Sequence, residues 1–139
     1  LDLPSMEEQR EEAVLHIEDA LKPVGVPVVR GADSLSTAAA ALADSRATAC
    51  LVHLIDGSWY AMSQDELTTA TATLTPDTPI QRALKPDRTP TLFPDMPLDS
   101  ALHYFPRWPL LPISNRATRG ALEGVLTLDD VLGRYRNPD

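Results

Sequence analysis

Apolar residues recur with helical spacing at two places in this chain. The two stripes are Leu35, Ala38, Ala39 and Leu42, and Leu98, Ala101, Leu102 and Phe105. Each stripe occupies positions i, i+3, i+4 and i+7, which form one face of an α-helix, and the stripes are 63 positions apart. Ser34 precedes the first and Pro97 the second, and both residue types are common at helix starts. The pattern therefore predicts two amphipathic helices at equivalent places in an internal repeat.

A second pair of segments supports the repeat. Residues 63–66 read Ser-Gln-Asp-Glu and residues 127–130 read Thr-Leu-Asp-Asp, 64 positions apart. Each follows a short run of apolar residues and is followed by further apolar residues with helical spacing. We therefore predict another helix in each repeat, beginning near residues 63 and 127.

Runs of β-forming residues lie between the two helices of each repeat. In the first repeat they cover 49–55 and 59–62, separated by the turn signal Asp56-Gly57. In the second they cover 110–113 and 122–126, and a further run precedes each first helix, at 26–29 and 91–93. The predicted fold is α/β (α+β), with two pseudo-symmetric β-α-β-β-α repeats packed together, because a unit this small buries too little surface to be stable alone.

The remaining segments set the expected boundaries. Residues 6–22 are predicted to form an amphipathic helix with Val14, Ile17 and Leu21 on one face. We expect 1–22 to be an N-terminal helix and linker, 23–75 the first repeat, 76–90 a proline-containing linker with a helical turn near 80–84, and 91–137 the second repeat.

Composition and charge exclude several classes of function. The chain has 12 Lys and Arg against 20 Asp and Glu, a formal net charge of −8. Nucleic acids and anionic membranes are therefore disfavoured as partners. No apolar run is long enough to span a bilayer, so direct membrane insertion is not expected. Cys50 is the single cysteine, which excludes an internal disulfide, and its apolar surroundings predict an inert buried thiol.

The second repeat carries the residues of a known family. Gly124, Thr127 and Asp130 form a Gly-x-x-Thr-x-x-Asp run, and 111–113 read Leu-Pro-Ile. With the tandem strand–helix–strand–strand–helix pattern, these segments resemble a CBS-domain pair, the Bateman module. In the first repeat Tyr60 stands where the family usually has glycine, and Glu66 stands where aspartate is usual.

The resemblance implies a regulatory role. CBS pairs bind adenine nucleotides such as AMP, ADP or ATP between their repeats, and many form homodimers. Residues 14–22 and 126–135 are similar to the cytosolic C-terminal region of chloride-channel-family proteins, which implies a cytoplasmic domain that modulates an attached membrane transport domain. Because the sequence begins with Leu1, we expect it to be part of a longer protein. The alternative is a CBS pair that binds no ligand and serves as a dimerisation module of another host protein.

Thr127 and Asp130 have two interpretations. A hydroxyl followed three positions later by an acid is a capping-box pattern, which stabilises a helix and needs no ligand. The same helix N-terminus suits a phosphate, with Thr127 donating to it and Asp130 accepting from the ribose hydroxyls. Ser63 and Glu66 form a weaker second candidate site, for which the capping role is favoured.

The family resemblance also implies an adenine pocket on the strands of the second repeat. The positions are Thr91, Leu92, Pro112 and Ile113. The alternative is that these residues belong to the core, and for Leu92 and Ile113 the core is favoured.

Nothing in the sequence predicts an enzyme. The three histidines are scattered and lack metal-ligand spacing, and there is no nucleophile motif. We therefore expect no metal and no required cofactor. Trp59, Tyr60 and Trp108 lie beside predicted strands, where they either form an interface between two copies or are buried within one chain.

Overall fold

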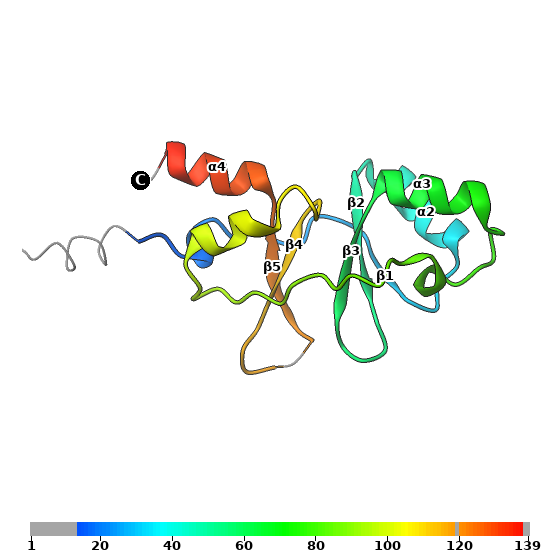
Figure 1. The fold of residues 1–139 in the computed structure, drawn as a ribbon, viewed down its shortest axis with the longest axis horizontal. Coiled ribbons are helices and arrows are strands. Elements are labelled where there is room, and N and C mark those ends of the chain that lie inside the picture. Colours follow the sequence, from blue (N-terminus) through cyan, green and yellow to red (C-terminus); the bar gives the residue numbers. More distant parts are fainter. Residues whose placement is uncertain (1–13, 119, 138–139) are drawn as a thin grey trace, which may run out of the picture.

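The computed structural model describes residues 14–118 and 120–137, which form two similar halves (Figure 1). The first half contains β1 (Val28–Arg30), α2 (Leu35–Ser45), β2 (Ala49–His53), β3 (Trp59–Ser63) and α3 (Gln64–Thr73). The second contains the 3₁₀ helix η3 (Leu98–Tyr104), β4 (Leu111–Ser114), β5 (Leu122–Leu126) and α4 (Leu128–Arg136). The 3₁₀ turns η1 (Ile17–Asp19) and η2 (Ile80–Ala83) precede the first strands of the two halves. The predicted mixed α/β fold with two repeats is confirmed.

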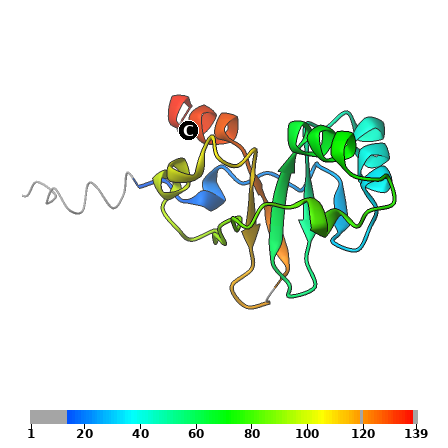
Figure 2. The same cartoon turned by 45° about the vertical axis from the view of Figure 1, so that its right-hand side comes forward.

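The first repeat has a three-stranded sheet in the order β1-β2-β3. β1 and β2 are parallel, and β2 and β3 form an antiparallel hairpin in which Cys50 pairs with Met62. α2 begins after Ser34, whose hydroxyl accepts a hydrogen bond from the Thr37 amide at 3.1 Å. Figure 2 shows α2, α3 and α4 at one end of the strands and the two hairpin turns at the other.

The second repeat has the same topology with a reduced first strand. β4 and β5 are antiparallel, and the strand predicted at 91–93 is present only as one parallel bridge between Leu92 and Ile113. Pro90 and Pro94 flank this bridge and have no N–H group for a ladder. The Pro94 carbonyl accepts instead from the amide of Glu18 at 2.9 Å.

The helix predicted over 97–105 is a 3₁₀ helix, η3. With three residues per turn, positions i and i+3 share a face, so Leu98 and Ala101 are buried while Leu102 is exposed. Phe105, predicted to be a core residue, is only partly buried against the core. The α-helical spacing of the apolar residues was therefore misleading here.

Two seven-residue segments share a pattern that extends the repeat. Residues 17–23 and 80–86 both read Ile-x-x-Ala-Leu-Lys-Pro, again 63 positions apart. We call them the first and second lead-in segments, and they contain η1 and η2. Their correspondence extends the repeats back to Ile17 and Ile80, beyond the boundaries predicted at 23 and 91.

Each lead-in segment packs on the opposite repeat. The Ile17 amide donates to the Met96 carbonyl at 2.9 Å, and the Ile80 amide donates to the Asp33 carbonyl at 2.7 Å. Met96 and Asp33 are themselves 63 positions apart, so each repeat receives the lead-in segment of the other repeat at an equivalent place. We call this reciprocal packing the lead-in exchange. In Figure 1 the blue first lead-in segment lies beside the yellow and red elements of the second repeat.

This exchange explains why the helix predicted over 6–22 is wrong for the part that the structure describes. His16 forms a bridge with Pro97 and Lys22 forms one with Val125, so the backbone groups of this segment bond to the second repeat instead of to a helix of their own. Only the turn η1 remains helical. Residues 6–13 of the predicted helix lie outside the described residues.

One hydrophobic core runs through both repeats. Tyr60 and Trp108 are 1% and 4% exposed, with their rings edge to face at a centroid distance of 5.2 Å. These two aromatic residues are therefore buried within one chain. Cys50 is fully buried, as predicted. Within 14–118 and 120–137, no helix combines the length and the apolar character that crossing a bilayer requires.

Candidate functional site

The N-terminus of α4 is built as a reciprocal capping box. The Thr127 hydroxyl accepts from the Asp130 amide at 3.2 Å, and the Asp130 carboxylate accepts from the Thr127 amide at 3.0 Å. The capping interpretation is therefore confirmed. The box uses one of the two carboxylate oxygens of Asp130, and a carboxylate can accept several hydrogen bonds, so capping and ligand binding are compatible at this residue.

A groove lies between α4 and the first lead-in segment. Its volume is about 300 Å³, at the lower end of the range for small-molecule sites. We call it the Lys22 groove, and its charged lining residues are Asp19, Lys22, Asp129, Asp130 and Arg134. Ligands in this groove would contact both repeats, because Lys22 precedes the first repeat and α4 ends the second.

Gly124 is the residue that brings Lys22 to this place. A Cβ atom at Gly124 would lie 2.3 Å from the Lys22 carbonyl oxygen. The absent side chain lets the lead-in segment lie directly on β5, where the Lys22 amide donates to Val125 at 3.1 Å and the Val125 amide donates back at 2.9 Å. Glycine is thus required here for close backbone approach.

Arg134 lines the Lys22 groove and carries a buried donor. Its Nε atom is buried and has no hydrogen-bond partner among the described residues. Buried donors are nearly always paired in proteins, so this atom indicates a position where an acceptor from a ligand would be favourable. Three acids and two bases line the groove, which favours a ligand with few negative charges.

The equivalent groove in the first repeat, the Lys85 groove, differs in two respects. It lies between α3 and the second lead-in segment, has a volume of about 450 Å³, and is lined by Ser63, Glu66, Arg82 and Lys85 among others. The Ser63 hydroxyl accepts from the Glu66 amide at 3.1 Å. The Glu66 carboxylate, however, accepts from the Tyr60 hydroxyl at 2.9 Å, whereas no side chain in the described part of the chain donates to the Asp130 carboxylate, which accepts from the Thr127 amide.

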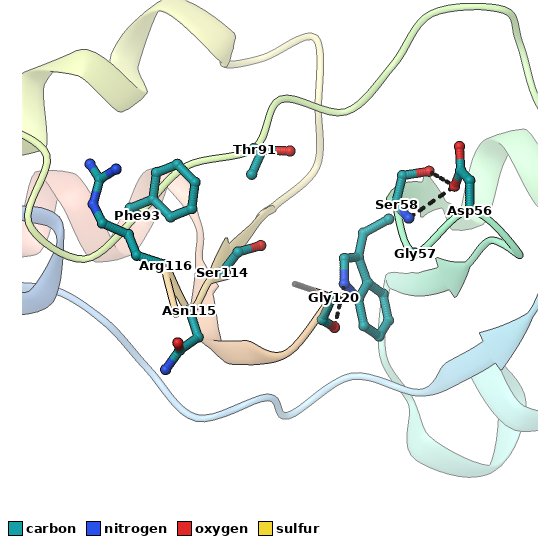
Figure 3. Close-up of a pocket in the computed structure, with 10 residues that line it drawn as sticks. Asp56, Gly57, Ser58, Thr91, Phe93, Ser114, Asn115, Arg116 and Gly120 are labelled. Atoms are coloured by element: carbon teal, nitrogen blue, oxygen red, sulfur yellow. Dashed lines mark hydrogen bonds between the residues drawn. The ribbon is translucent and has the colours of Figure 1, made fainter. Parts of the chain in front are cut away.

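Thr91 lies in a third place, a cleft between the two hairpin turns that we call the hairpin cleft. Its volume is about 260 Å³, and Figure 3 shows Thr91 and Ser114 between Phe93 on one side and Gly57 and Ser58 on the other; Trp59 also lines this cleft. The Trp59 indole N–H donates to the Gly120 carbonyl at 3.1 Å, which joins the two repeats at this end. Arg116 stacks over Phe93 and pairs with Asp95 at 2.9 Å.

Residues predicted for the main nucleotide site are divided between two places, and those of the weaker second candidate site lie in a third. Asp130 lines the Lys22 groove, Ser63 and Glu66 line the Lys85 groove, and Thr91 lines the hairpin cleft. Leu92, Pro112 and Ile113 are buried in strand pairing and line none of these three places.

Sequence reasoning missed Lys22 and Arg134. The repeated Ile-x-x-Ala-Leu-Lys-Pro pattern was the signal that could have identified Lys22. Arg134 has no such signal, because the equivalent position, 64 residues earlier, is Ala70.

The described residues offer little for catalysis or metal binding. No group of three or more His, Cys, Asp or Glu in 14–118 and 120–137 is arranged to hold a metal ion. Burial, and secondarily the charge of Glu66, raise the pKa of the Cys50 thiol to about 11, so this cysteine remains protonated and poorly nucleophilic at neutral pH.

No known protein family matches this chain by sequence, and no curated protein sequence matches it. Solved structures do match its fold. A CBS domain-containing protein of unknown function from Bacillus anthracis is 18% identical with a TM-score of 0.74, over 94% of this chain and 99% of that one. CBSX2 in complex with AMP is 18% identical with a TM-score of 0.67, over 88% and 97%.

The CBS domain pair of MJ0100, in complex with 5′-methylthioadenosine and S-adenosyl-L-methionine, is 15% identical with a TM-score of 0.68, over 91% of this chain and 99% of that one. These matches cover nearly the whole of both partners, including both repeats. The chain therefore has the fold of a tandem CBS domain pair. In that fold the Lys22 and Lys85 grooves occupy equivalent positions in the two repeats.

Proposed function

We propose that this chain is a regulatory CBS pair that binds an adenine nucleotide in the Lys22 groove and thereby modulates a protein to which it is attached. The observation that carries the proposal is the composition of this groove. It combines the Asp130 carboxylate oxygen that the capping box does not use, the ammonium group of Lys22 and the guanidinium group of Arg134, whose buried Nε has no hydrogen-bond partner among the described residues. The AMP and adenosyl complexes of CBSX2 and MJ0100 support the ligand class.

The roles of the groove residues follow from their chemistry. Asp130 accepts from the ribose hydroxyls while its other oxygen keeps the capping bond to Thr127. Arg134 and Lys22 provide donors and positive charge for one phosphate. Because three acids also line the groove, we expect AMP to bind more tightly than ADP, and ADP more tightly than ATP.

Regulation follows from the two-sided lining of the groove. A ligand shifts a conformational equilibrium only by its differential affinity for the two states. A nucleotide that contacts the first lead-in segment and α4 favours the arrangement in which both are in place. We propose a membrane transport protein of the chloride-channel type as the attached protein, and the support for this part is the sequence resemblance of residues 14–22 and 126–135 alone.

Calorimetric titration with AMP, ADP and ATP tests the ligand. Asp130→Asn removes the charge but keeps an oxygen that can cap Thr127, so we expect folding to be preserved and AMP affinity to fall at least about 10-fold. Glu66→Gln changes the equivalent residue of the other repeat and serves as the matched control, with unchanged affinity. The proposal is wrong if millimolar AMP, ADP and ATP produce neither heat nor a rise in melting temperature, or if Asp130→Asn binds AMP like the wild type.

A second candidate is a dimerisation module that binds no ligand. The internally satisfied Thr127–Asp130 box favours it, and so do the exposed apolar residues Leu102, Leu132 and Tyr135 on η3 and α4. A homodimer through this surface predicts that Leu132→Glu is a monomer in sedimentation experiments while the wild type is a dimer. A monomeric wild type that binds AMP would exclude this candidate.

A further inference from the structure

Tyr60 is the position at which the two repeats differ most in their local structure. It lies 64 positions before Gly124, the same offset that relates Glu66 to Asp130 and Ser63 to Thr127. In the second repeat, Gly124 lets the first lead-in segment pair directly with β5 through two backbone hydrogen bonds. The equivalent contact in the first repeat is built differently.

The Tyr60 side chain lies between β3 and the second lead-in segment. The Lys85 amide donates to the Tyr60 hydroxyl at 3.4 Å, and the Ala61 amide donates to the Thr89 hydroxyl at 3.0 Å. These bonds replace the backbone pair that Lys22 and Val125 make in the second repeat. The phenol ring has therefore taken the space between strand and lead-in segment that is closed by backbone in the other repeat.

This ring is held firmly in place. Tyr60 is 1% exposed and packs edge to face against Trp108. Arg107 lies over the Trp108 ring at 4.1 Å and pairs with Asp87 at 2.9 Å. The aromatic contact, the cation–π contact and the ion pair together fix the phenol between the repeats.

The hydroxyl of Tyr60 also engages the carboxylate that a ligand would need. Glu66 accepts from it at 2.9 Å. Burial and this bond raise the pKa of Tyr60, so the hydroxyl remains a donor throughout the neutral range. A ribose that approached this oxygen of Glu66 would have to displace a partly buried hydrogen bond to a charged acceptor.

We propose that Tyr60 is an internal occupant of the first-repeat site: its ring takes the space between β3 and the second lead-in segment and its hydroxyl engages one oxygen of Glu66, so the chain binds one nucleotide instead of two. This inference rests on the proposed function for its choice of ligand and assigns to Tyr60 the role of setting the stoichiometry. The Lys85 groove outside the ring remains open to solvent and is also lined by Asp65, but Glu66, the equivalent of Asp130, is already engaged by Tyr60.

The test isolates the first repeat by using Asp130→Asn to weaken the other site. In that background, Tyr60→Gly restores the residue found at the equivalent position of the second repeat, and Tyr60→Leu keeps an apolar side chain while removing the hydroxyl. We expect calorimetry with AMP to show that Tyr60→Gly regains binding and that a further Glu66→Gln substitution abolishes it. In the wild-type background, Tyr60→Gly raises the stoichiometry from one AMP per chain to two.

The two Tyr60 variants distinguish a failure to fold from a failure to bind AMP. Circular dichroism and thermal melting establish which variants are folded, and if Tyr60→Gly does not fold, Tyr60→Leu decides, with binding about 10- to 100-fold weaker than at the wild-type site. Folded Tyr60 variants that gain no site, beside a wild type that binds one AMP, overturn the inference. A wild type that binds no AMP, beside a Tyr60→Gly variant that does, overturns the proposed site in the Lys22 groove but supports the occupation of the first-repeat site by Tyr60.

Discussion

Gly124→Ala is the substitution for which the structure makes its sharpest energetic prediction. The new Cβ would lie 2.3 Å from the Lys22 carbonyl oxygen, where ordinary contact begins at 3.4 Å. The neighbour is backbone, so the lead-in segment must retreat by about 1 Å. That retreat breaks two hydrogen bonds with Val125, worth about 0.5–1.5 kcal/mol each, and adds overpacking of about 1–3 kcal/mol.

We therefore expect Gly124→Ala to lower the free energy of unfolding by about 2–6 kcal/mol and the melting temperature by at least about 5 °C. The matched control is Gly133→Ala in α4, where a Cβ meets nothing within 4 Å. It should raise stability by about 0.5–1 kcal/mol, because alanine is the better helix former. Urea denaturation and thermal melting measure both. Equal stability of Gly124→Ala and the wild type would show that the lead-in segment does not lie on β5.

Three further predictions concern separate contacts. Thr127→Ala removes the cap of α4 and should lower unfolding stability by about 0.5–2 kcal/mol in urea; no change would contradict the capping box. Trp59→Phe removes the indole N–H that donates to the Gly120 carbonyl and should lower the free energy of unfolding by about 0.5–1.5 kcal/mol. An unchanged free energy of unfolding would show that the hairpin turns do not meet. Burial raises the pKa of Cys50 from 9.0 to about 11, so the native state retains a proton that the unfolded state loses, and stability falls as pH rises from about 9 to 11. Cys50→Ala should flatten that decline, and an unchanged slope would show that this thiol is not its source.

Local signals in the sequence were sufficient to predict the elements whose hydrogen bonds and apolar contacts come from residues near them in the chain. α2, α3 and α4 each begin after a hydroxyl residue that caps them, at Ser34, Ser63 and Thr127. The β2–β3 hairpin follows from two β-forming runs around Asp56-Gly57. In all these cases the hydrogen bonds and the apolar face are encoded within about a dozen residues, so the pattern and the structure agree.

Elements whose partners lie far away in the sequence could not be read from their own residues. The segment around Ile17 has helical spacing, yet its amides bond to Pro94 and Met96. η3 has helical spacing too, but its apolar residues follow the 3₁₀ period and leave Leu102 exposed. Helix propensity is weak evidence that tertiary contacts override. Both wrong helix predictions concern segments whose contacts come from the lead-in exchange.

The same limit applied to the candidate site. The Thr127–Asp130 box was visible because both residues lie within one turn. The placement of Asp130 and Lys22 in one groove was not visible, because it depends on Gly124 admitting a segment that lies about a hundred residues earlier in the chain. Thr91 was assigned to the same site as Asp130 from the family resemblance, whereas the structure places Thr91 in the hairpin cleft and a lead-in segment beside Asp130.

The exchange also determines how the two repeats depend on each other. Ile17 and Ile80 are fully buried, and each contributes to the core beside the opposite repeat. Neither repeat is therefore complete without a segment that leads into the other. A change at one lead-in segment, such as a ligand in the Lys22 groove, acts directly on the packing of both repeats. A ligand in the Lys22 groove would therefore be coupled to the packing of the two repeats without a separate pathway. The same lead-in segment forms both a wall of the groove and the contact between the repeats.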